Sequence, residues 1–307
     1  MRQKLATMSY TTRPMTQPPA PSLTAFVMCA DDYGMTPEIS AGILELAQQQ
    51  RISATSVMSL SPHWPEWARP LQAVKSRIDV GLHLDWTSNF AIERGFGGSL
   101  PQVMALSALR CLSAKTAKRA IEQQLDLFEQ HFQSTPDHLD GHQHIHQFPV
   151  IRDALMNVLS HRYTTTRRPW VRISRVTEQP MSLKSRVINV MGARALQTLA
   201  DRCGFAHSQA LTGVYDFHGD SALYRQRLRH WLTHLPLHTV LMCHPGQGLG
   251  DGSTLATARA TEQEVLVSPE FQTLLNSTQT TMLRGQTLFC PHDTTPPTTT
   301  HHDASLD

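Results

Sequence analysis

The 307-residue sequence predicts an α/β fold, a distorted TIM-like (β/α) barrel with mainly parallel strands in a single domain. Short apolar segments alternate with longer amphipathic ones about seven times, which is typical of a parallel sheet with helical crossovers. No glycine fingerprint of the Rossmann type follows the first strand-like segment, and this favours a closed or nearly closed barrel over an open sheet. No repeat and no Gly/Ser-rich linker divides the chain, so we expect one domain over residues 24–290.

The elements follow from periodicity and from capping signals. The continuous apolar segment from Ala25 to Ala30 is typical of a strand that is buried on both faces. Thr36, followed by Pro37, predicts the N-cap and first residue of a helix. The same reasoning predicts strands over 54–60, 78–84, 171–174 and 239–243, and helices over 65–75, 114–132, 150–160, 183–200, 221–235 and from 268 onwards.

The two ends of the chain and its overall composition narrow the function classes. Residues 1–23 and 291–307 are polar and rich in Thr and Pro, so we expect disordered extensions with no signal peptide and no membrane span. The formal net charge of +2, without runs of Lys or Arg, argues against a nucleic-acid partner. The five cysteines are scattered and form no CxxC pair, which is typical of reduced thiols in a cytoplasmic protein.

The stretch from His138 to His146 contains four histidines and one aspartate in nine residues. If it is extended, Asp140, His142 and His144 share one face of a sheet. If a helix begins at His142 instead, His142 and His146 lie one turn apart, the spacing of helical zinc pairs. Either geometry presents imidazole to a metal ion, whereas a solvated, histidine-rich turn is the alternative without function.

Polar residues stand at the carboxyl ends of several predicted strands, where a (β/α) barrel places its active site. They are Asp31 and Asp32 after the first strand, His83 and Asp85 at the third, Asp140 and His142 at the fourth, and His244 after a late strand. Taken singly, Asp31 and Asp32 would form an acidic turn that caps a helix, and His83 would be a core residue. Together these residues predict one site in which one aspartate binds a cation and the other faces a water molecule.

The motifs that carry these residues also resemble a known family. Over about residues 25–285 the chain contains Ala30-Asp-Asp-Tyr-Gly-Met35 with Ser53-Ala-Thr-Ser56, Asp79-Val-Gly-Leu-His-Leu84, His138-Leu-Asp-Gly-His-Gln-His-Ile-His146 and Met242-Cys-His-Pro245. In this order they resemble the YdjC-like carbohydrate deacetylases, which include the chitooligosaccharide deacetylase and the hopanoid-associated HpnK-type proteins. The combination of motifs is specific, although each one alone would be weak.

The resemblance implies a barrel that hydrolyses the N-acetyl group of an amino sugar with one divalent metal ion, Mg²⁺ or Zn²⁺. By position, it implies Asp32, His83 and His142 as metal ligands, Asp31 as general base and His244 as general acid. Two imidazoles and one carboxylate suit zinc, and with several waters they also hold magnesium. The expected partner is therefore an acetylated amino sugar, and the resemblance is compatible with a homodimer.

Five further residues are weaker candidates for substrate contacts or for support of the ligands. Asp140 would orient a ligand imidazole, and His144 and His146 would support the ligands or hold the sugar. His146 is the alternative ligand if its stretch is helical. Arg172 would steer the general base or bind substrate, unless it is a surface arginine. Trp86, like Trp64, would stack on a pyranose ring, although an aromatic residue in a barrel is more often in the core.

Two rival functions remain at this point. One is a metal hydrolase of the amidohydrolase type that acts on another amide or ester, a class that usually places His-x-His at the first strand, whereas here the first strand ends in two aspartates. The other is a non-catalytic barrel that binds sugar or metal. A binding protein has no use for a second carboxylate beside the metal, so the role of Asp31 distinguishes it from an enzyme.

Overall fold

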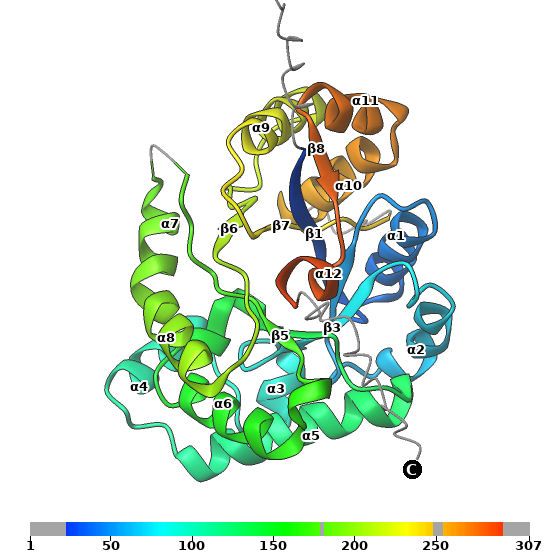
Figure 1. Cartoon of the computed structure of the whole chain (residues 1–307). Coiled ribbons are helices and arrows are strands. Elements are labelled where there is room, and N and C mark those ends of the chain that lie inside the picture. The colour runs from blue at the N-terminus through cyan, green and yellow to red at the C-terminus, as the bar shows by residue number, and fades with distance from the viewer. Residues whose placement is uncertain (1–22, 179–180, 248–253, 291–307) are drawn as a thin grey trace, which may run out of the picture.

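Eight strands and the helices that connect them make up the computed structural model, which describes residues 23–178, 181–247 and 254–290 (Figure 1). The two predicted extensions therefore lie, apart from Leu23, outside the described residues. The strands are β1 (Thr24–Tyr33), β2 (Ala54–Val57), β3 (Asp79–Leu84), β4 (His138–Gly141), β5 (Trp170–Val171), β6 (Ala210–Thr212), β7 (Thr239–Cys243) and β8 (Thr280–Met282).

Helices follow most of the strands and surround the curled sheet (Figure 1). The α-helices are α1 (Pro37–Gln48), α2 (Trp64–Gln72), α3 (Asn89–Glu93), α4 (Leu100–Ala108), α5 (Ala114–Phe132), α6 (Ile151–Arg162), α7 (Leu183–Ile188), α8 (Arg194–Cys203), α9 (Ser221–Thr233), α10 (Thr254–Val267), α11 (Pro269–Ser277) and α12 (Gly285–Phe289). The short 3-10 helices are η1 (His142–Gln147) and η2 (Thr165–Arg167), and η3 (Asn189–Ala193) is a short π-helical segment.

The strands form one parallel sheet in the order β5-β4-β3-β2-β1-β7-β6, and β8 pairs in parallel with the amino-terminal part of β1. The end strands β5 and β6 lie on either side of a seam that isolated bridges cross, Val171 with His207 and Val176 with Leu211. The sheet thus curls into a barrel that is incompletely hydrogen-bonded along this seam. This arrangement confirms the predicted distorted TIM-like barrel with mainly parallel strands in a single domain.

Local sequence signals account for many of the element bounds. Both α5 (Ala114–Phe132) and β7 (Thr239–Cys243) have the predicted bounds, and the hydroxyl of Thr36 accepts the backbone N–H of Ile39 at the start of α1. The helix predicted over 183–200 is divided into α7 and α8 instead. Gly192 in η3 has φ of 125°, a left-handed conformation that interrupts a regular helix.

The short elements β6, β8, α3, α4 and α12 were not predicted, and neither was α10, a longer helix. The buried face of α10 includes Arg259, Glu262 and Gln263, so the helix lacks the apolar stripe that reveals a helix in a sequence. The predicted strand over 171–174 is observed as the two-residue β5, Trp170–Val171, which shares only Val171 with the prediction. No helix in the described part of the chain is long and apolar enough to cross a membrane.

Candidate metal centre

Alternate residues of each strand turn toward the barrel axis, and toward the carboxyl ends of the strands several of these inward-facing side chains are polar. In β1, Phe26 and Met28 belong to the main apolar core, whereas Val27 and Cys29 belong to a second, smaller cluster. Asp31 continues the row of Val27 and Cys29 and is buried. On neighbouring strands and just after β5, the buried polar side chains that make contact with one another in this interior are Ser56, His83, His138, Asp140 and Arg172.

Asp32 joins this interior through an irregular backbone. In a regular strand its side chain would point to the opposite face from Asp31. Instead, Asp32 has φ of 73°, and the pairing of β1 with β2 shifts register between Ala30 and Tyr33. A left-handed non-glycine residue costs about 1–3 kcal/mol and persists where its surroundings hold it. Both consecutive carboxylates consequently line the same cavity, as the sequence predicted.

Asp32, His83 and His142 form a compact group whose possible ligand atoms all lie within 4.8 Å of one another. The Oδ1 atom of Asp32 is 3.5 Å from Nε2 of His83 and 3.2 Å from Nδ1 of His142. Three nitrogen and oxygen donors beside an open cavity are the arrangement by which catalytic metal sites leave a position for water or substrate. The structure thus brings together the three residues predicted as ligands, and their donor set fits a divalent cation.

Asp140 fixes the orientation of His83. Its Oδ1 atom lies 2.6 Å from Nδ1 of His83, which leaves Nε2 directed toward Asp32. Its Oδ2 atom accepts a hydrogen bond from Ser56 at 2.5 Å and contacts Nη2 of Arg172 at 3.0 Å. Burial opposes the negative charge, but Arg172 and His83 outweigh it and hold the pKa of Asp140 well below its ordinary value. Asp140 is therefore an ionised partner of the kind that orients ligand histidines.

Ser56 links Asp140 to His138, a contact that sequence reasoning missed. Nε2 of His138 is 3.0 Å from the Ser56 hydroxyl, and the His138 ring stacks on Trp170 with 4.4 Å between centroids. On its other side the ring lies against Gly81, where an added Cβ would come within 2.4 Å of it. Burial lowers the pKa of His138, so its ring is held in the neutral form.

Arg172 joins Asp31 to the same network, because its guanidinium contacts both Asp31 and Asp140. The guanidinium of Arg172 donates to both carboxylate oxygens of Asp31, at 2.8 and 2.9 Å, which is a bidentate pair. Nε2 of His244 lies 4.0 Å from Oδ2 of Asp31, and both residues line the cavity. Arg172 is fully buried, so the alternative of a surface arginine is wrong.

Two residues of α10, Arg259 and Glu262, complete the site and were not predicted. Arg259 donates to Oδ2 of Asp32 and, at 3.3 Å, to the carbonyl of His244. Glu262 accepts the backbone N–H of His244 and the hydroxyl of Tyr215, both at 2.6 Å. In the sequence, a charged residue in a helix is expected on its exposed face, so nothing distinguishes Arg259 and Glu262 from surface residues. Only the fold shows that they contact the site.

The charges around the group favour a cation. Three carboxylates, Asp31, Asp32 and Asp140, face two guanidinium groups, Arg172 and Arg259, which leaves one excess negative charge. Burial favours neutral His83, but Asp140, Asp31 and Asp32 outweigh it and raise the pKa of His83 to about 9. The potential that holds a proton on His83 in the absence of metal is of the sign that attracts a metal ion.

The rest of the histidine stretch adopts neither of the two predicted geometries. It forms the short turn η1, in which Gln143 and His144 both have left-handed backbone, with φ of 54° and 62°. His144 lines the cavity, and its Nδ1 lies 3.0 Å from the Ser174 hydroxyl. Nε2 of His146 lies 2.8 Å from the carbonyl of Arg172, and His146 does not line the cavity. His142 and His146 therefore do not form a pair on one helical face, because the left-handed backbone of Gln143 and His144 interrupts the helical spacing between them.

Neither tryptophan considered as a sugar platform is available for stacking. Trp86 is buried and packs edge-on against Phe96, and Trp64 is buried and stacks on Phe128. Neither lines the cavity of the metal centre. Both serve the apolar core, which is the commoner role of an aromatic residue in a barrel.

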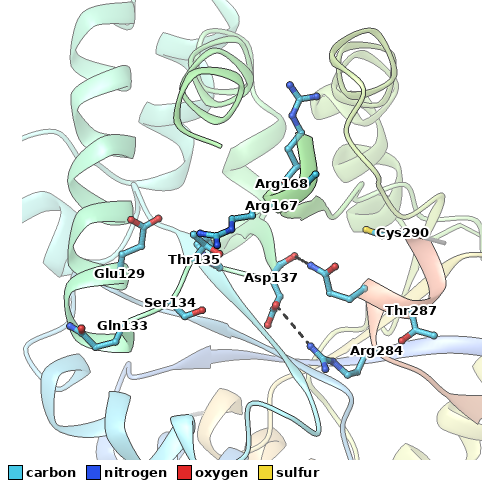
Figure 2. Close-up of a pocket in the computed structure, with 13 residues that line it drawn as sticks. Glu129, Gln133, Ser134, Thr135, Asp137, Arg167, Arg168, Arg284, Thr287 and Cys290 are labelled. Atoms are coloured by element: carbon cyan, nitrogen blue, oxygen red, sulfur yellow. Dashed lines mark hydrogen bonds and ion pairs between the residues drawn. The ribbon is translucent and has the colours of Figure 1, made fainter. Parts of the chain in front are cut away.

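A cavity of about 730 Å³ at the carboxyl ends of the strands is lined by six of the candidate residues, Asp31, Asp32, His83, His142, His144 and His244. A larger cavity, about 1140 Å³, lies near the amino ends of β4 and β5, and Figure 2 shows it with Asp137, Arg284 and Cys290. None of the predicted site residues lines that cavity. Its Arg284 already forms an ion pair with buried Asp79, with Nε 2.7 Å from Oδ1. We therefore consider the smaller cavity, which the predicted residues line, to be the better candidate for an active site.

Known proteins share this sequence pattern and fold. A carbohydrate deacetylase of Xenopus laevis is 25% identical over 156 residues, 47% of this chain and 50% of that protein. One of Enterococcus faecalis is 24% identical over 132 residues, 39% of this chain and 48% of that protein, so the matches span about half the length of these relatives. A crystal structure from Enterococcus faecalis V583, described provisionally as a cellobiose-phosphate cleavage protein, shares the fold with a TM-score of 0.65 at 17% identity, covering 87% of this chain and 100% of that one. The model of the YdjC-like protein family matches residues 25–277, and the chain therefore belongs to this family.

Proposed function

We propose that the protein is a metal-dependent carbohydrate deacetylase that hydrolyses the N-acetyl group of an amino sugar. The observation that carries the proposal is a second carboxylate, Asp31, which lies in the same cavity as Asp32, His83 and His142 and is held by a buried arginine. The two carbohydrate deacetylases similar to this chain support the same reaction class.

Hydrolysis of an amide requires a nucleophilic water, stabilisation of charge on the carbonyl oxygen and a proton for the leaving amine. A divalent ion such as zinc or magnesium, when bound by Asp32, His83 and His142, supplies a lowered pKa for water and polarises the carbonyl. Asp140 holds the ring of His83 by its Nδ1 atom so that Nε2 is free for the ion. Arg259 holds the second oxygen of Asp32 and leaves the first for the ion.

Asp31 is the proposed general base, and Arg172 its positioning residue. The bidentate contact fixes the plane of the Asp31 carboxylate while each oxygen keeps a lone pair for the proton of the attacking water. His244 is the proposed acid. Burial and Arg259 lower the pKa of His244 to about 4, although Asp31 and Asp32 oppose them, so His244 starts neutral at pH 7. Its Nε2 atom, 4.0 Å from Asp31, can accept the proton that Asp31 has taken and deliver it to the leaving nitrogen.

Metal content and acetate release, measured on the same samples, test the proposal. Purified wild type should contain near-stoichiometric metal and release acetate from di-N-acetylchitobiose, whereas Asp32→Ala and His142→Ala should lose both. Asp31→Asn should keep its metal and lose roughly a hundred- to ten-thousand-fold in turnover. His161→Ala, which removes an exposed imidazole on α6, is the matched control and should change neither quantity.

Each other outcome has a distinct meaning. If the protein binds metal but releases acetate from no acetylated sugar, the proposed substrate would be wrong, and the enzyme would act on another amide or ester. Full turnover of Asp31→Asn would contradict the assigned base. Wild type without metal after incubation with zinc, magnesium and manganese would overturn the metal centre.

A further inference from the structure

His244, the proposed acid, is held by hydrogen bonds through its backbone but not through its ring. Glu262 accepts its backbone N–H, and Arg259 donates to its carbonyl. In the ring, Nε2 lies 4.0 Å from Oδ2 of Asp31, and Nδ1 is buried without a hydrogen-bond partner among the described residues. The orientation of the imidazole ring must therefore depend on packing.

Phe217 packs directly against this imidazole ring. It lies in the loop over 213–220, between β6 and α9, and its ring centroid is 5.3 Å from that of His244. The two ring planes meet at 87°, the edge-to-face arrangement that aromatic pairs prefer. Both side chains line the cavity of the metal centre. The contact restricts the ring plane of His244, which no hydrogen bond fixes.

The loop that carries Phe217 has an unusual backbone. Phe217 has φ of 62°, a left-handed conformation that is an outlier for a bulky residue. Gly213, at the start of the loop, has φ of 92°, and an added Cβ there would come within 2.2 Å of the Met242 carbonyl. The loop thus begins in close contact with β7, the strand that His244 follows. Strain of this kind persists where the surroundings hold it, and it is concentrated at functional sites.

Two neighbours hold Phe217 in this conformation. The ring of Tyr215 lies 4.9 Å from it between centroids, and the ammonium of Lys184 lies 4.4 Å from the centroid, over the ring. Lys184 also donates to the carbonyl of Tyr215 at 3.0 Å. The Tyr215 hydroxyl donates to Glu262, the same carboxylate that accepts the backbone N–H of His244. One connected group of residues therefore holds both the ring and the backbone of His244.

We propose that Phe217 is a positioning residue for the acid, because it holds the imidazole of His244 with Nε2 directed toward Asp31 and the reacting group. This inference rests on the proposed function, in which His244 delivers the proton to the leaving nitrogen. A general acid must be within hydrogen-bond reach of the atom that it protonates. Misplacement by about 1 Å can cost roughly a hundredfold in rate.

Steady-state kinetics with di-N-acetylchitobiose, together with metal analysis of the same samples, test this role. Phe217→Ala should lower kcat about 10- to 100-fold and keep its metal, because only the ring of the acid is released. KM should change by less than about threefold, since ground-state binding does not use the acid. Phe217→Tyr keeps an aromatic ring and should keep most of the turnover.

Two further variants separate positioning from general damage to the fold. Phe217→Gly removes the ring and also the backbone strain, because glycine adopts positive φ without steric cost, and it should lose turnover as Phe217→Ala does. Phe96→Ala removes another half-buried ring, which packs against Trp86 and does not line the cavity of the metal centre. It is the matched control and should change neither kcat nor KM.

The other kinetic outcomes would each overturn the inference. Unchanged kcat of Phe217→Ala and Phe217→Gly, with acetate release by the wild type, would keep the proposed reaction and exclude the positioning role. A raised KM with unchanged kcat would make Phe217 a contact of the bound sugar instead. Loss of metal together with turnover would assign Phe217 a structural role.

NMR spectra of the histidine rings decide the inference independently of the reaction. The signal of His244 is identified by its absence in His244→Gln. If the wild type releases no acetate, a His244 signal that shifts in Phe217→Ala but not in Phe96→Ala would overturn the reaction and keep the contact that orients the ring. A His244 signal that stays unchanged in Phe217→Ala would overturn the positioning role whatever the activity.

Discussion

Replacing Asp137 by asparagine is expected to stabilise the protein relative to the wild type as the pH rises. Asp137 precedes β4, and its Oδ2 atom accepts the backbone N–H of Val80 at 2.8 Å. Figure 2 shows it beside Arg284, whose guanidinium lies 4.0 Å away. Burial and the carboxylate of Asp79 raise the pKa of Asp137 to about 6, although the Val80 N–H and Arg284 oppose them.

The direction follows from the raised folded-state pKa. Asp137 contributes stability that is complete below its ordinary value of 3.8 and is lost as the pH rises through about 6. A difference of about two pKa units corresponds to about 3 kcal/mol at neutral pH, of which about 2 kcal/mol falls between pH 4.5 and 7.5. The Asp137 side chain is 28% exposed, so solvent screening reduces the effect and both free energies are upper limits.

Urea unfolding at pH 4.5, 6.0 and 7.5 measures the effect. The unfolding free energy of Asp137→Asn minus that of the wild type should rise by about 1–2 kcal/mol across this range. Asparagine keeps an oxygen for Val80, so the comparison isolates the charge. Glu93→Gln removes an exposed carboxylate of α3 and should give a difference that stays within about 0.5 kcal/mol. A pH-independent difference for Asp137→Asn would refute the reasoning.

Two further predictions concern the support of the candidate metal centre. Ser56→Ala should weaken zinc binding about 10- to 100-fold in calorimetry, because it removes a hydrogen bond that holds Asp140. The control is Ser59→Ala, which should leave the affinity unchanged because the Ser59 hydroxyl donates to the carbonyl of Gln124 and not to Asp140. Unchanged affinity of Ser56→Ala would show that Asp140 is held without Ser56. Gly81→Ala should cost about 1–3 kcal/mol in urea unfolding, because its Cβ would stand 2.4 Å from a His138 ring that Trp170 confines, whereas at Gly98 the nearest atom is the end of the Gln102 side chain at 3.3 Å. Equal costs for Gly81→Ala and Gly98→Ala would contradict the role of the close contact.

The residues at the strand ends could be predicted because two local rules place them. Side chains alternate along a strand, and parallel neighbours keep their carboxyl ends at one edge of the sheet. His83 pairs with Asp140 in the register of β3 and β4, and Ala30 pairs with Cys243 in that of β1 and β7. These registers bring the polar residues of distant segments to one cavity. The irregular backbone of Asp32 is the exception, because its left-handed φ follows from its surroundings and not from its residue type.

The residues that α10 contributes to the site could not be predicted from the sequence. Its buried face is partly polar, and such a face is stable only because of tertiary contacts that the sequence does not reveal. Arg259 finds Asp32 and the carbonyl of His244, and Glu262 finds Tyr215 and the N–H of His244. Without those partners, burying this face would leave polar groups unpaired at a cost of about 1–3 kcal/mol each. The packing of α10 and the geometry of the candidate metal centre are therefore coupled. The charged residues of the cavity hold the helix in place, and the helix in turn holds Asp32 and His244 in position.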